Sequence, residues 1–124
     1  MRGFTQAIIM GNLTADPDVK DVGESKVANF KVAVNRKWRD RAGELQEAVD
    51  FISVVAWNNT AENVEKYLKK GDPVFVEGRL EEDRWESNEG QKRSKIQIVA
   101  RTVTFLSRPP KDEPEETADE DSFK

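Results

Sequence analysis

The sequence predicts a mainly β protein, a five-stranded Greek-key barrel with one helix between its third and fourth strands. Three observations lead to this prediction. Five segments rich in β-branched and aromatic residues are separated by turn signals, and the segment between the third and fourth has helical spacing. In addition, Gly78 interrupts the fourth segment, where a barrel strand would bend or bulge. An open α+β sheet covered by the helix is the alternative, but the glycine and two long hairpin arms favour the barrel.

The strands are expected at residues 4–13, 27–35, 48–57, 73–85 and 91–106. The first leads into a turn at Asp16 and Pro17, because a residue before proline is biased out of the helical region. The second alternates apolar and polar residues, which is typical of a half-buried strand. Residues 21–26 are polar, so we expect them to be a connection.

The helix is expected to follow Trp57 directly. Asn59 is a candidate N-cap with Glu62 three residues later, and Gly71 occupies the expected C′ position. Between them, the apolar stripe comprises Ala61, Val64, Tyr67 and Leu68. Three strands, a helix and two strands are the element order of the OB-fold, a barrel whose exposed strand face and hairpin loops bind oligonucleotides or oligosaccharides.

The third strand poses the functional question, because both of its faces are partly apolar. One face carries Ile52, Val54 and Ala56, which suit a closed core. The other carries Phe51, Val55 and Trp57. This second face is either a second core or a platform on which bases stack.

Composition excludes several classes of function. The chain has no cysteine and no histidine, so disulfides, the common zinc sites and nucleophilic triads are not expected. No metal or other cofactor is expected. The only apolar run near the start, residues 7–10, is too short for a signal peptide or a membrane span, which predicts a soluble, cytoplasmic protein without a membrane partner.

Two basic hairpins flank the third strand. The first, at residues 36–44, surrounds Trp38 with Arg36, Lys37, Arg39 and Arg41. The tip of the second surrounds Trp85 with Arg84, Lys92, Arg93 and Lys95, although acidic neighbours dilute this patch. Trp38 either folds back onto the core from a solvated loop or stacks on a base while the cations contact phosphates.

The last segment, residues 108–124, is predicted to be a disordered acidic tail after an OB-fold domain at residues 1–107. Of the net charge of −4, the tail accounts for all, since it holds three basic and seven acidic residues. Its prolines and carboxylates leave too little apolar surface to offset ordering. Near its end the tail carries one aromatic residue among acidic ones. The ring is either incidental or part of a short motif that enters a partner's pocket, and the motif would comprise Asp119, Glu120, Asp121 and Phe123.

Over residues 4–106 the chain resembles bacterial-type single-stranded DNA-binding proteins. The resemblance is carried by Ile9-Met10-Gly11-Asn12-Leu13, Asp16-Pro17, Trp38-Arg39-Asp40, Gly43-Glu44, Glu65-Lys66-Tyr67-Leu68-Lys69-Lys70-Gly71, Val76-Glu77-Gly78-Arg79-Leu80, Arg84-Trp85 and Gly90-Gln91. It implies stacking roles for Trp38, Trp57 and Trp85, with Phe51 standing where a tryptophan is common. It also implies a homotetramer built partly by pairing of first strands, and a tail that recruits replication and repair proteins. The tail departs from the family pattern, because its linker is short and Lys124 follows Phe123.

The expected function is binding without catalysis. We expect the four rings to stack on unpaired bases and the cations to run beside the phosphates of nucleoid-associated single-stranded DNA during replication, recombination and repair. The alternative is an OB-fold module that binds a protein or an RNA through the same aromatic face. Exchanging Trp57 for alanine separates the two, because DNA binding fails with the assembly intact in the first case and the assembly fails in the second.

Overall fold

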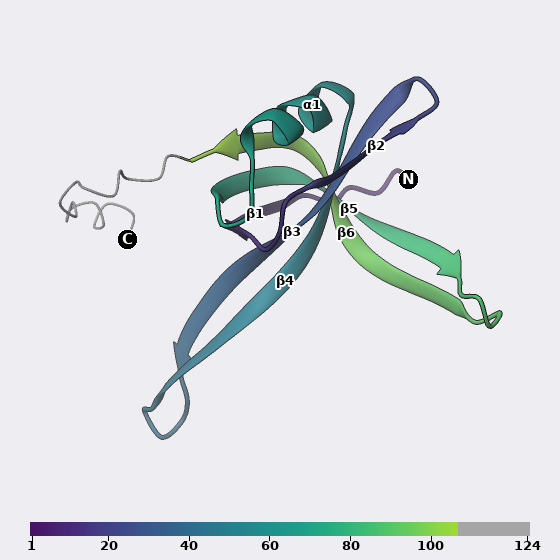
Figure 1. The fold of residues 1–124 in the computed structure, drawn as a ribbon. Helices are drawn as coiled ribbons and strands as arrows, with labels where there is room; N and C mark the ends of the chain where they lie inside the picture. The colour runs from purple at the N-terminus through teal and green to yellow at the C-terminus, as the bar shows by residue number, and fades with distance from the viewer. Residues whose placement is uncertain (107–124) are drawn as a thin grey trace.

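The computed structural model describes residues 1–106. Five of its strands close into a barrel, and one helix packs against the barrel (Figure 1). The elements are β1 (Ala7–Leu13), β2 (Asp18–Val22), β3 (Ser25–Arg39), β4 (Leu45–Trp57), α1 (Asn58–Tyr67), β5 (Pro73–Glu86) and β6 (Lys92–Phe105). The sheet order is β1-β5-β6-β4-β3-β2, and an additional pairing of β1 with β3 closes the barrel. The predicted OB-fold barrel, with its helix between the third and fourth barrel strands, is confirmed.

Two glycines stand where the barrel strands approach most closely. A Cβ atom on Gly11 would overlap the backbone carbonyl of Ala33 at the junction of β1 and β3. A Cβ atom on Gly78 would overlap the backbone of Val99, and the register of β5 against β6 shifts at this point. Gly78 therefore marks a β-bulge, as the sequence predicts, because only a residue without a side chain fits between the two backbones.

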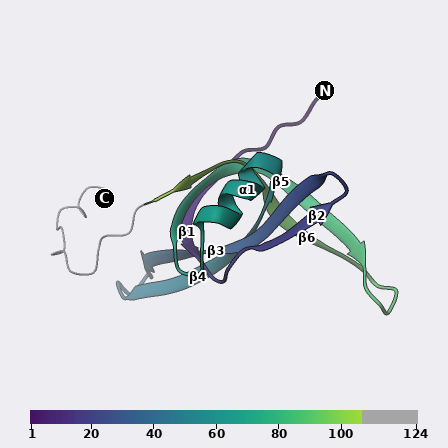
Figure 2. The same cartoon turned by 45° about the horizontal axis from the view of Figure 1, so that its top comes forward.

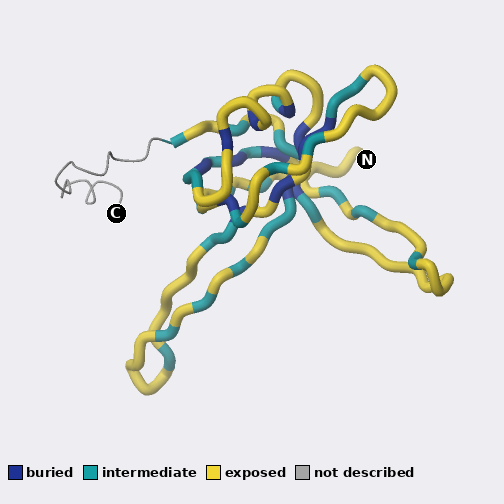
Figure 3. Tube along the Cα trace, in the orientation of Figure 1, coloured by how far each residue is buried: buried dark blue, intermediate teal, exposed yellow. Residues whose placement is uncertain are grey.

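The core fills the barrel beneath α1. Its buried members come from every barrel strand and from the helix, and the fully buried ones include Val32, Val54, Val64, Val76 and Ile98. Figure 3 shows that burial is concentrated in the barrel and that the two long hairpins are mostly exposed. The alternating residues 28–34 and 52–56 supply two walls of this core, as predicted.

β2 is a strand that the sequence analysis missed. It pairs with the start of β3 from Asp18 opposite Asn29 to Val22 opposite Ser25, and Gly23 turns the chain with φ of 62°. The expected connection at residues 21–26 is thus partly wrong. β2 contains two apolar and three charged residues, so its own β-strand propensity is weak. Pairing with the neighbouring β3 makes it a strand.

The predicted helix caps are also wrong. Trp57 is the N-cap residue and makes no side-chain capping hydrogen bond, while Asn59 lies inside the first turn. Asn58 accepts a hydrogen bond at Oδ1 from the Lys26 backbone N–H (3.1 Å), so a contact with β3 fixes the helix start. Gly71, with φ of 90°, donates its N–H to the Leu13 carbonyl (2.9 Å) and serves the turn into β5 rather than the helix end.

Two arms extend from the barrel, as both views show (Figures 1 and 2). One is the far half of β3 and β4, and the other is the far half of β5 and β6. Because the ladder between β3 and β4 continues to Arg39 opposite Leu45, most of the cations predicted in a loop belong to a strand. The turn itself contains only residues 40–44. The predicted tail, its partner-binding residues and the domain boundary after residue 107 lie outside the described residues.

Candidate nucleic-acid interface

The register of β3 against β4 assigns each residue of the first arm to a face. Directly opposed residues of an antiparallel ladder share a face, and neighbours along a strand alternate. Phe51 lies opposite Ala33, Ser53 opposite Lys31, and Trp57 opposite Val27. These positions form one face, opposite to the core residues Val54 and Ala56. We call it the outer face.

The outer face continues onto β5 and β6. β6 runs parallel to β4 with Val55 beside Val99, and Val99 lies opposite Arg79. Alternation from Arg79 then places Trp85 on the same face, directly opposite Arg93. Three of the four predicted rings thus share the outer face, with exposed fractions of 62% for Phe51, 43% for Trp57 and 45% for Trp85.

Trp38 belongs to the other face. It lies opposite Gln46 and alternates in phase with the core residues Val32 and Val34, so it occupies the core side of the arm beyond the barrel. It does not fold back onto the core, since 43% of it is exposed. The sequence alone could not show this division, because the register decides which residues of β3 and β4 face the same way.

Arg36 holds the ring of Trp38. Its guanidinium lies 5.1 Å from the ring centroid and donates two hydrogen bonds to Asp50, from Nε to Oδ2 (2.6 Å) and from Nη2 to Oδ1 (3.3 Å). The hydrogen bond to Asp50 raises the pKa of Arg36 above its ordinary value. Arg36 therefore supports the ring of Trp38 while it is paired with Asp50, and its predicted phosphate contact stays a prediction.

The eight predicted phosphate contacts divide between the two faces. By register, the outer face carries Lys37, Arg39, Arg93 and Lys95, the core side carries Arg36, Arg84 and Lys92, and Arg41 lies in the turn. Arg84 is neutralised by Glu82 at 2.7 Å, a contact that lowers the pKa of the Glu82 carboxyl. Within residues 1–106, Lys37, Arg41, Lys92 and Lys95 form no ion pair.

Asp40 organises the turn of the first arm. Its Oδ1 accepts a hydrogen bond from the Glu44 backbone N–H (2.9 Å), and its Oδ2 accepts one from Gln46 Nε2 (3.1 Å). The Glu44 bond is the main reason why the pKa of the Asp40 carboxyl is lowered. Arg39 spans the same turn by donating to the Gly43 carbonyl (2.9 Å).

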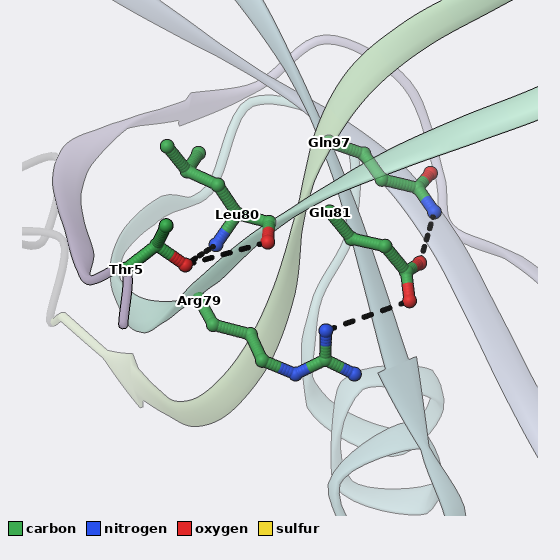
Figure 4. Close-up of polar contacts among 5 residues, drawn as sticks. All are labelled: Thr5, Arg79, Leu80, Glu81 and Gln97. Atoms are coloured by element: carbon green, nitrogen blue, oxygen red, sulfur yellow. Dashed lines mark hydrogen bonds and ion pairs between the residues drawn. The ribbon is translucent and has the colours of Figure 1, made fainter. Parts of the chain in front are cut away.

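Acidic side chains on the outer face are partly engaged. Figure 4 shows Arg79 and Gln97 reaching Glu81, at 3.5 Å from Arg79 Nη1 to Oε2 and at 3.1 Å from Gln97 Nε2 to Oε1. The same view shows Thr5 clamped to the backbone of Leu80, whose N–H donates to Oγ1 at 3.0 Å. The charge of Glu81 is thus balanced beside the strands that carry the rings.

Two positions differ from the sequence-based interpretation. Val55 lies on the outer face by register but is only 5% exposed, so it is covered within the chain itself. Lys31 was not singled out, yet it is exposed on the outer face opposite Ser53. The alternation of residues 27–35 places Lys31 on the polar side of β3, and that pattern could have drawn attention to it.

The described residues contain no group of acidic side chains arranged to hold a metal ion. Nor does any helix among residues 1–106 have the length and apolar character needed to span a membrane.

Comparison with known proteins decides the family. The profile described as the single-strand binding protein family matches residues 4–106. The chain belongs to this family. The match covers all the strands of the barrel and both arms up to Leu106.

Relatives within the family share more than a third of their aligned residues with the chain. A single-stranded DNA-binding protein 2 from Chlorobaculum tepidum is 38% identical over 110 residues, covering 87% of this chain and 74% of that protein. A single-stranded DNA-binding protein from Deinococcus radiodurans is 37% identical over 107 residues, covering 85% of this chain but only 35% of that protein.

Among solved structures, one described as a Plasmodium falciparum SSB complex with ssDNA superposes with a TM-score of 0.81. It is 31% identical to this chain and covers 86% of this chain and 98% of its own. The barrel and the arms therefore have the shape of a family member that was solved with single-stranded DNA.

Proposed function

We propose that the chain binds single-stranded DNA with little sequence preference and without catalysis, and so protects it during replication, recombination and repair. The observation that carries the proposal is the exposure of Phe51, Trp57 and Trp85 on one continuous face beside lysines that form no ion pair within the described residues. Membership of the family and the likeness to the Plasmodium falciparum complex support it.

Stacking supplies the affinity and explains the lack of base preference. Each base stacked on an aromatic side chain contributes about 1–3 kcal/mol, and every base offers the same kind of flat surface. Phe51 contributes less area than a tryptophan but keeps the flat ring. Lys37, Arg93 and Lys95 lie on the same face and would contact the phosphates.

Trp38 would stack on DNA that passes over the opposite face of the first arm. The pair formed by Arg36 and Asp50 keeps its ring in place before the DNA arrives. A strand of DNA that stacks on all four rings must therefore pass from one face of this arm to the other. Arg41 lies in the turn at the tip of the arm.

The protein would assemble as a homotetramer partly through β1. β5 pairs with β1 along one edge, whereas β3 pairs with it only at Asn12 and Leu13. The rest of the second edge is open to a copy of the same strand. The apolar side chains of Ile8 and Met10 on β1 are 53% and 56% exposed. A partner copy paired with the open edge of β1 would cover them.

Replication and repair proteins would bind the acidic tail around Phe123, and the protein would act on DNA in the cytoplasmic nucleoid. The ring of Phe123 and the carboxylates before it are the components of a short motif that fits an apolar pocket with a basic rim.

Titration of the intrinsic tryptophan fluorescence with oligo-dT tests the proposed function. We expect strong quenching by single-stranded oligo-dT and much weaker binding of duplex DNA of the same length, because paired bases cannot stack on the rings. Absence of quenching, or equal affinity for the duplex, would refute the proposal.

A further inference from the structure

A hollow on the outer face joins three strands of the barrel. It encloses about 250 Å³ and is lined by Thr14 to Asp16 after β1, by Asn29 to Lys31 of β3, by Ser53 and Val54 of β4, and by Lys95 of β6. Lys31 lies directly opposite Ser53 in the ladder of β3 and β4. The side chain of Lys95 reaches the same hollow from the neighbouring β6. Two lysines from different strands thus line the same hollow as Ser53.

Neither of the two lysines forms an ion pair within residues 1–106, although Asp83 is the cross-strand neighbour of Lys95. Asp16 also lines the hollow, but its Oδ1 accepts the Lys70 backbone N–H at 2.8 Å. The hollow therefore presents two ammonium groups against one carboxylate that is already hydrogen-bonded.

The hollow lies along β4 between two of the exposed rings. On the outer face, Ser53 is two residues from Phe51 and four residues from Trp57. At a strand rise of about 3.3 Å per residue, these separations are about 7 Å and about 13 Å. DNA whose bases stack on both rings must carry its backbone past the hollow.

We propose that Lys31 and Lys95 form a phosphate-binding subsite that anchors the DNA backbone between the bases stacked on Phe51 and Trp57. The two ammonium groups bind the phosphate oxygens, and the Ser53 hydroxyl and the Asn29 side-chain amide are positioned to donate hydrogen bonds to them. This subsite rests on the proposed function, since its ligand is a phosphate of the bound strand.

The salt dependence of binding tests the subsite. Affinity for an oligo-dT of about 10 nucleotides, within the range of one OB-fold, is measured at several salt concentrations for the whole chain and for K31Q/K95Q. Each phosphate bound on a single strand contributes about −0.7 to the slope of log affinity against log salt. We expect K31Q/K95Q to lose about one such increment and K31R/K95R to retain it.

The control is K66Q, which removes one lysine charge from α1, where Lys66 lies 5.6 Å from the Tyr67 ring and is not among the residues that line the hollow. It is expected to leave the slope unchanged. An unchanged slope in K31Q/K95Q, or an equal loss in K66Q, overturns the subsite while the wild-type quenching by oligo-dT still supports the proposed function. If the wild-type chain does not bind oligo-dT at all, both fail.

Discussion

At the scale of single residues, Phe51 tests the stacking role most simply. Replacing it by alanine is expected to weaken oligo-dT binding by about 1–3 kcal/mol, and replacing it by tryptophan to strengthen both binding and quenching. Its ring is 62% exposed, so the free energy of unfolding is expected to change by no more than about 0.5 kcal/mol. Calorimetric titration measures the affinity and urea denaturation the stability.

Val22→Ala is the matched control for Phe51→Ala. Val22 is 53% exposed at the end of β2, away from the arms, and its removal is expected to leave DNA affinity unchanged. Equal affinities of the two variants for oligo-dT would show that Phe51 takes no part in binding.

Asp40 makes the turn of the first arm sensitive to acid. Its pKa is lowered in the folded chain, so its contribution to the turn is complete above the ordinary aspartate pKa of about 3.9 and is lost as the pH falls through the lowered value. Hydrogen exchange of the Glu44 amide, which donates to Asp40, is expected to lose protection in that acidic window and not at neutral pH. Unchanged relative protection in acid would contradict the role of this bond.

The sequence predicts which rings are exposed better than it predicts how the candidate interface residues are arranged. All four rings are exposed, as a stacking role requires. It cannot reveal that Asp50 neutralises Arg36 or that Glu82 neutralises Arg84, since each pair depends on where neighbouring side chains point. Counting cations along the chain therefore overstates the charge available to DNA.

At the scale of elements, the first arm presents rings on both of its faces. Variants that each retain a single tryptophan report DNA binding on one face at a time. With an oligo-dT of about 8 nucleotides, the variants that retain only Trp57 or only Trp85 are expected to be quenched, whereas the variant that retains only Trp38 requires a longer strand that crosses the arm. Stopped-flow or steady-state fluorescence measures the quenching of each variant.

Equal quenching of all three single-tryptophan variants by the short oligonucleotide would contradict the two-faced arrangement. The order of quenching with increasing length would also show which rings the DNA reaches first.

Elements with a strong pattern were predictable, and elements defined by their neighbours were not. The alternation of β3 and the bulge at Gly78 could be recognised because they follow from side chains and from the lack of one. β2 and the true start of α1 depend on pairing with β3, in the second case through the bond from Lys26 to Asn58. Such contacts join distant positions and leave little trace in local sequence.

At the scale of the whole molecule, the open edge of β1 predicts assembly. Ile8→Glu places a charge within the strand that would pair with a second copy, so the mass in solution is expected to fall below that of the proposed wild-type tetramer. Light scattering after size-exclusion chromatography measures it. Val22→Glu adds the same charge at an equally exposed position, 53%, and is expected to leave the mass unchanged. A wild-type mass for Ile8→Glu would contradict assembly through β1.

The central claim is that stacked bases, more than phosphate contacts, hold the DNA. It is tested most directly by comparing oligo-dT with an abasic strand of the same length, which keeps the phosphates and lacks the bases. We expect the abasic strand to bind more weakly by about 1–3 kcal/mol for each ring that it leaves unoccupied, with a similar salt slope. Equal affinity for the two strands would contradict it.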